Sequence, residues 1–256
     1  MEKILPYIIA CPLVGLAGFV DSIAGGGGLI SIPAYLIAGL PPVTASATNK
    51  ISAMMGTTVS FHEYFKNKFV NFKLAVPCIF IAMFFSSIGA RIQMMIPEYY
   101  LKIFMLIALP VTLIFILNKN AFKSRSIFGT KLTKKVYLLS FLVSAGLGLY
   151  DGIYGPATGT FLIMFFVKIV GMNIKESNGM AKTINWATNF GALLLFVFAN
   201  KAIIPLGICC GLFNMIGCYI GSHLFVKKGS DIVRPIMIVV MSIFIIKIVL
   251  ELTHVI

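Results

Sequence analysis

Ten apolar stretches, separated by short loops, constrain this 256-residue chain more than any other feature. A membrane-spanning helix needs roughly 20 consecutive apolar residues, and one soluble core could not bury so many stretches of nearly that length. Charged residues make up only 11% of the chain, whereas a soluble domain carries about 25%. The chain is therefore predicted to be an all-α polytopic membrane protein with a single domain, 1–256. The stretches lie at about 4–24, 29–40, 44–64, 73–96, 99–117, 136–151, 153–171, 177–199, 202–225 and 230–252.

The two halves of the chain resemble each other in sequence. Matching residues recur at an offset of about 130 positions, which drifts by two or three residues as loop insertions allow. Internal repeats of this kind are typical of transporters. We therefore predict two repeated halves of five apolar segments each, at about 4–118 and 136–256, joined by a basic linker at 118–135. The matching pairs include Gly18 and Gly148, Asp21 and Asp151, Gly25 and Gly155, Lys50 and Lys182, and Gly89 and Gly221.

The basic residues predict the orientation of the chain. The linker 118–135 carries six Lys and Arg and no acidic residue, so the positive-inside rule places it in the cytoplasm. With the linker in the cytoplasm, and with an odd number of crossings in each half, both termini lie outside. The two halves then have inverted topology. A parallel arrangement of the two halves, with four crossings in each, would put Lys227, Lys228 and Arg234 outside, against the positive-inside rule. The same rule accounts for the net charge of +13 without a nucleic-acid partner.

Glycines interrupt the first pair of apolar segments. Four consecutive glycines are costly in a helix, and the segment after them, about twelve residues, makes only about 18 Å of helix. We expect a glycine-broken or re-entrant helix pair in each half, and between six and ten crossings in all. Exposed backbone at membrane depth must lie inside protein or line a wet cavity, and a helix N-terminus favours anions. The alternative is close helix packing by small residues. The predicted binding residues here are Gly25, Gly26, Gly27, Gly28, Gly155 and Thr158.

Polar side chains run along the third segment of each half. Intramembrane polar residues face the bundle interior or water, and a set of lysine and amide donors without an acid suits an anion. In the alternative interpretation, each lysine extends to the membrane interface. The predicted substrate-binding residues are Thr48, Asn49 and Lys50 in the first half and Asn178, Lys182, Asn185 and Asn189 in the second.

Two aspartates occupy equivalent positions inside apolar segments. A carboxylate in a membrane segment is costly and indicates function. Asp21 and Asp151 are the candidates for coupling anion movement to a proton or Na⁺. Alternatively, each caps a helix end or forms an ion pair with Lys50 or Lys182.

The motifs resemble those of the sulfite exporter TauE/SafE family. The resemblance rests on Gly18–Pro33, on Ala45–Ile51 and on Asn178–Asn185, and it covers essentially the whole chain. It implies a bacterial or archaeal inner-membrane permease for small anions, with sulfur-containing species as the usual substrates. The second half departs from the pattern, with Pro156, Ala157 and Thr158 where the family often keeps more glycine, so the two loops need not bind substrate equally.

These features together favour a secondary permease that moves a small anion, such as sulfite or an organosulfonate, by alternating access. A passive anion channel is an open alternative. An intramembrane enzyme acting on a sulfur or lipid compound is a weaker one, because the three histidines form no set with a nucleophile or metal ligands. We expect no cofactor, metal or nucleic acid, and the five cysteines are interpreted as core residues. The expected partners are the anion and the lipid bilayer.

Overall fold

The computed structural model describes residues 4–97, 99–101 and 131–228. All regular elements in these ranges are helical, which confirms the all-α prediction. The predicted segments at 99–117 and 230–252, and the linker 118–135, lie wholly or mostly outside the described residues. The helices are α1 (Leu5–Ala24), α2 (Gly28–Ile37), α3 (Pro42–Lys66), α4 (Phe72–Met95), α6 (Lys134–Ile153), α7 (Thr158–Phe165), the short π-helix η1 (Phe166–Val170), α8 (Ile174–Phe198) and α9 (Ile204–Lys228).

Local sequence explains where several helices begin. Pro42 is the first residue of α3, a position where the missing N–H of proline costs nothing. The side chain of Thr133 accepts a hydrogen bond from Val136 N at 3.3 Å, and that of Asn173 accepts one from Glu176 N at 2.9 Å. These two side chains cap α6 and α8 and satisfy amides that have no partner within the helix.

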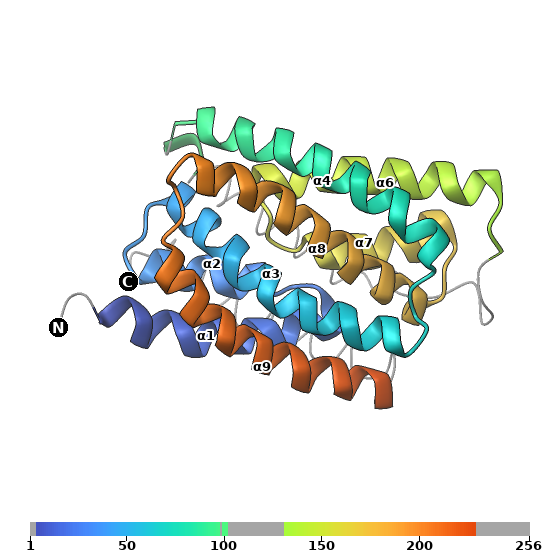
Figure 1. The fold of residues 1–256 in the computed structure, drawn as a ribbon, viewed down its shortest axis with the longest axis horizontal. Helices are drawn as coiled ribbons and strands as arrows, with labels where there is room; N and C mark the ends of the chain where they lie inside the picture. Colours follow the sequence, from blue (N-terminus) through green and yellow to red (C-terminus); the bar gives the residue numbers. More distant parts are fainter. Residues whose placement is uncertain (1–3, 98, 102–130, 229–256) are drawn as a thin grey trace, which may run out of the picture.

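The helices pack in two groups. In the first group, α9 packs along both α1 and α3, and α2 lies against α1. In the second group, α4 packs along both α6 and α8, and α7 lies against α8. Figure 1 shows α1 beside α9 on one side of the molecule and α4 beside α6 on the other. α9 belongs to the second half of the sequence but packs with helices of the first, and α4 belongs to the first half but packs with helices of the second. Each half therefore contributes one helix to the other half's group.

Four of the described helices, α1, α4, α6 and α9, are long and apolar enough to cross a membrane. α2 has ten residues, which is about 15 Å of helix against a hydrocarbon core of about 30 Å. It is therefore too short to span by itself, as the glycine pattern predicts. α3 and α8 have 25 residues each and are polar, and they contact each other where the two groups meet.

The outward faces of the long helices are apolar. Phe80 and Phe84 on α4, Leu138 and Leu142 on α6, and Ile216 on α9 are each more than half exposed. In water, an exposed apolar surface of this kind would favour association. It suits a protein surrounded by lipid, where apolar side chains face the acyl chains.

Glycines bring the helix backbones into close contact at both main interfaces. A Cβ on Gly217 of α9 would lie 2.0 Å from the carbonyl oxygen of Gly15 in α1. A Cβ on Gly152 of α6 would lie 2.2 Å from the carbonyl oxygen of Ser86 in α4. Packing by small residues is thus the role of the glycines along these interfaces, and the glycines at the helix breaks lie elsewhere.

Candidate functional site

A polar cavity of about 30 Å³ lies inside the bundle, lined by residues of α1, α2, α3, α6, α7, α8 and α9 and of the two helix breaks. A water molecule occupies at least 10–15 Å³ by this measure, so the cavity has room for about two. Most of the residues predicted to bind substrate or couple ions line it: Asp21, Gly25, Gly27, Gly28, Asn49, Lys50, Asp151, Gly155, Asn185 and Asn189.

Two buried ion pairs cross between the halves of the sequence. Lys50 Nζ of α3 lies 2.6 Å from Asp151 Oδ2 of α6. Lys182 Nζ of α8 lies 2.7 Å from Asp21 Oδ2 of α1. Each lysine also donates to the backbone carbonyl of its aspartate partner. The ion-pair alternative for the aspartates is therefore realised, and the lysines are buried rather than extended to the membrane interface.

The two helix breaks meet at the cavity. Gly25 adopts the left-handed conformation, with φ of 78°, which glycine adopts without steric cost. Its carbonyl oxygen accepts a hydrogen bond from Thr160 N at 3.1 Å. A Cβ on Gly25 would lie 2.2 Å from the carbonyl carbon of Gly159, so glycine is required for the break before α2 to touch the start of α7.

The hydrogen bonds of Asp21 link the end of α1 to the glycine break. Its Oδ1 accepts from Gly27 N at 3.2 Å, while its Oδ2 accepts from Lys182. A Cβ on Gly27 would lie 2.5 Å from the Cβ of Asp21, so no larger residue fits there without movement. The predicted helix-end cap and the predicted ion pair therefore coexist at one carboxylate.

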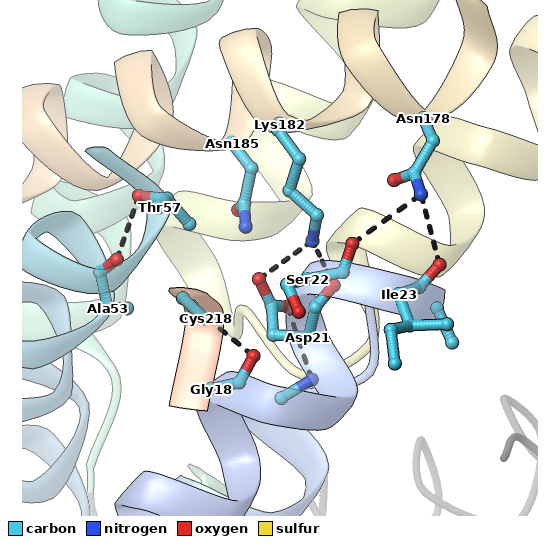
Figure 2. A network of polar contacts seen from close by, with 12 residues as sticks. Gly18, Asp21, Ser22, Ile23, Ala53, Thr57, Asn178, Lys182, Asn185 and Cys218 are labelled. Atoms are coloured by element: carbon cyan, nitrogen blue, oxygen red, sulfur yellow. Dashed lines mark hydrogen bonds and ion pairs between the residues drawn. The ribbon is translucent and has the colours of Figure 1, made fainter. Parts of the chain in front are cut away.

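Residues of α8 and α3 hold the last turn of α1, and Figure 2 shows the contacts made from α8. Asn178 Nδ2 donates to the carbonyl oxygen of Ile23 at 3.0 Å, on the same face of α8 as Lys182. Tyr64 Oη of α3 donates to the carbonyl oxygen of Ser22 at 2.5 Å. These bonds satisfy carbonyl groups that the end of a helix leaves without a partner. Asn178 thus contributes to this structure and does not line the cavity.

Two amides at the cavity have unsatisfied hydrogen-bonding atoms. Asn49 Oδ1 and Asn189 Nδ2 are buried and find no partner among the described residues. The two side chains line the cavity together with those of Asn185 and Asn214. Because an unsatisfied buried polar group costs free energy, the cavity favours a ligand that bonds to these amides.

Several predicted site residues lie away from the cavity lining. Thr48 Oγ1 accepts a hydrogen bond from Ile203 N at 3.1 Å, and Thr158 Oγ1 donates to the carbonyl oxygen of Gly155 at 2.7 Å. A Cβ on Gly26 would have no atom nearer than 3.7 Å. Lys182 and Asn178 bind the end of α1, as described above. The sequence pattern brings the polar residues to one region but does not separate structural contacts from cavity walls.

Four cavity residues are not among the predicted binding residues, namely Ser31, Ala53, Gly159 and Asn214. Three of them carry a detectable signal. Ser31 follows Gly27 by four residues, so helical periodicity places it on the same face. Asn214 is a polar residue within an apolar segment, which by itself indicates an interior position. Gly159 ends the glycine-containing break predicted in the second half, at 155–159. Ala53 carries no such signal, because small apolar residues are common in packed helices.

Apolar helices that enclose paired charges and a polar cavity define a class of protein, the multi-pass membrane transporter. Comparisons with known proteins assign the chain to the same class, a membrane transporter. The model of the family described as Sulfite exporter TauE/SafE matches residues 10–248. The chain belongs to that family.

The chain is also similar to curated relatives over most of its length. It is 33% identical to the "Probable membrane transporter protein ORF9" of Sinorhizobium sp, over 99% of this chain and 97% of that one. It is 34% identical to the "Probable membrane transporter protein YfcA" of Escherichia coli, over 89% and 84% of the two chains. A "Probable membrane transporter protein" of Haemophilus influenzae is 32% identical, over 89% and 88%. The family and these relatives carry the names of transporters, not enzymes. No solved structure is significantly similar to the chain.

Proposed function

We propose that this chain is a secondary transporter of the inner membrane that moves a small anion by alternating access. The proposed substrate class is a sulfur-containing oxyanion or organosulfonate such as sulfite, in keeping with the description of the family. The observation that carries the proposal is the polar cavity, because it lies inside the bundle, between the two helix breaks and against both Lys–Asp pairs.

The helix breaks support anion binding. Gly28 is the first residue of α2 and Gly159 is the second residue of α7, and both line the cavity. The N-terminus of a helix carries a partial positive charge and attracts anions. Asn185 and Asn189, on the same face of α8, add amide groups that donate hydrogen bonds to an oxyanion.

The crossing contacts support a mechanism in which two inverted halves move relative to each other. Lys50 belongs to the first half and its partner Asp151 to the second, and the reverse holds for Lys182 and Asp21. A rocking movement of one half against the other would therefore change both ion pairs and the contact between the glycine breaks. Such rearrangement around a site near the membrane midplane is how repeat-containing transporters alternate access.

We also propose that Asp21 or Asp151 couples anion movement to a second ion. A proton or Na⁺ that reached either carboxylate would compete with the paired lysine. An inward gradient of protons, or of Na⁺, applied separately to reconstituted vesicles would show which ion accelerates uptake.

Reconstituted protein tests the function directly. Uptake of radiolabelled sulfite into proteoliposomes, kept free of oxygen, is compared with uptake of thiosulfate, a sulfonate and acetate, and protein-free liposomes serve as the control. We expect sulfite or a sulfonate to be taken up and acetate to be excluded. Uptake of none of the sulfur anions would refute the proposed substrate class.

Counterflow separates a carrier from the alternative, a passive channel. Vesicles preloaded with unlabelled sulfite should transiently accumulate labelled sulfite above its external concentration if the protein alternates access. A channel only equilibrates the label, so a trace without this overshoot would refute the alternating-access mechanism.

A further inference from the structure

The sequence makes Lys50 and Lys182 equivalent, but their surroundings in the structure differ. We infer that Lys50 is the lysine that binds the substrate anion, and that Lys182 holds the glycine break in position. This inference rests on the proposed function, since it assigns a residue to the anion that the protein transports.

Lys50 has a donor available at the cavity. Its side chain is 4% exposed, and the residue lines the cavity. A lysine ammonium group has three N–H donors. Two of the donors bond to Asp151, one to the carbonyl oxygen at 3.0 Å and one to Oδ2 at 2.6 Å. The third remains for an anion, which can therefore bind without breaking the ion pair.

Lys182 has no such access. Its side chain is 0% exposed, and Lys182 is not among the residues that line this cavity. Figure 2 shows it extending from α8 to the last turn of α1, where it bonds to the carbonyl and carboxylate groups of Asp21. Asp21 in turn accepts from Gly27 N. Lys182 thus connects α8 to the glycine break through Asp21.

The unsatisfied amides are consistent with this difference. Asn49, beside Lys50 in the sequence, is 6% exposed and lines the cavity with Asn189, which is 3% exposed. Each amide has an atom that finds no partner among the described residues. In the alignment that matches Lys50 to Lys182, the position of Asn49 is taken by Ala181, a fully buried residue that cannot form a side-chain hydrogen bond.

The chemistry that follows is recognition of a small oxyanion by one charged and several neutral donors. The Lys50–Asp151 pair is neutral overall, so the anion gains a charge-assisted hydrogen bond without meeting an uncompensated positive charge. Asn189 Nδ2 can donate a further hydrogen bond to another oxygen of the anion, whereas Asn49 Oδ1 is an acceptor and would bond to a protonated oxygen or a water molecule. An anion without acceptor oxygens would leave Asn189 Nδ2 unsatisfied.

Two charge-neutral double variants test the assignment. Lys50→Gln/Asp151→Asn removes the pair whose lysine faces the cavity, and Lys182→Gln/Asp21→Asn removes the pair that holds the glycine break. Neither leaves an unpaired buried charge. Sulfite affinity is measured by calorimetry on purified protein without oxygen, and gel filtration with thermal melting checks folding. We expect the first variant to lose at least about ten-fold in affinity, and the second to lose less affinity but more thermal stability, because it releases the glycine break. Equal losses of affinity, or the reverse order, would overturn the inference.

A second measurement does not depend on the substrate. Lys50→Cys and Lys182→Cys are made separately in a chain without the five native cysteines, each with its aspartate partner changed to Asn. A small water-soluble methanethiosulfonate reagent should modify the first variant at least about ten times faster, because only that side chain faces the cavity. Equal rates would overturn the inference. If wild-type protein binds no sulfur anion, the proposed function fails, while this accessibility result still decides which lysine faces the cavity.

Discussion

Replacement of Gly25 by alanine should damage the contact between the two helix breaks severely. The residue has φ of +78°, and an added Cβ would lie 2.2 Å from the carbonyl carbon of Gly159 and 2.3 Å from Thr160 N. The left-handed backbone costs a residue with a side chain about 1–2 kcal/mol. Overpacking costs about 1–3 kcal/mol, and loss of the buried hydrogen bond from Thr160 N costs a further 1–3 kcal/mol or so.

Together these terms predict a loss of roughly 3–8 kcal/mol, which is a large part of the 5–15 kcal/mol or so that stabilises an ordinary folded protein. Gly26→Ala is the matched control. Gly26 lies outside the left-handed region, and a Cβ there would have no neighbour nearer than 3.7 Å. Its change in stability should stay within about 1 kcal/mol.

The assay is unfolding by SDS in mixed micelles, followed by the fluorescence of the only tryptophan, Trp186. This residue is a suitable reporter because its ring stacks on Phe190, with centroids 5.7 Å apart, and its Nε1 donates to Thr58 Oγ1 at 3.0 Å. Unfolding removes both contacts. If the Gly25→Ala variant were as stable as the wild type, or if Gly26→Ala destabilised the protein equally, the argument that the helix breaks require glycine at this contact would be refuted.

Three further predictions follow from the packing, the charges and the sequence. Lys50→Gln should destabilise the protein by about 3–5 kcal/mol, because it leaves the Asp151 carboxylate buried and unpaired, and adding Asp151→Asn should recover most of this loss in the same unfolding assay. Gly217→Ala should lower the melting temperature strongly, since its Cβ would lie 2.0 Å from a carbonyl oxygen of α1, whereas Gly146→Ala, with no neighbour within 4 Å, should not; similar melting temperatures would contradict the close contact. A cysteine at Lys228 should react with a membrane-impermeant reagent only in inside-out vesicles, because the positive-inside rule places it in the cytoplasm; reaction in right-side-out vesicles would contradict the inverted topology.

The positions of the helices could be predicted from the sequence because hydropathy is a local property. The stretch predicted at 44–64 is α3, Pro42–Lys66, and the stretch predicted at 73–96 is α4, Phe72–Met95. The short segment after the glycines was also predictable, since glycine acts on the backbone around it. Among the described segments the prediction was least accurate at 153–171. There the helix begins only at Thr158, and it is followed by a π-helix that the hydrophobic pattern does not predict.

The sequence alone also determined which residue types would gather at the site. Lysine, aspartate and asparagine are so costly in a membrane that their presence indicated an interior polar region. Repeat equivalence predicted that Asp21 and Asp151 would have similar surroundings, and each does pair with a lysine. It left open which lysine each aspartate would meet.

Only the tertiary structure decided that pairing and the difference between the two lysines. The crossing of Lys50 to Asp151 and of Lys182 to Asp21 depends on how helices far apart in the sequence pack. Which of two equivalent residues meets a cavity depends on the side chains of every neighbouring helix. A hydropathy pattern records how strongly each residue prefers lipid to water. It contains no information about which other buried residue that residue will contact in the folded protein.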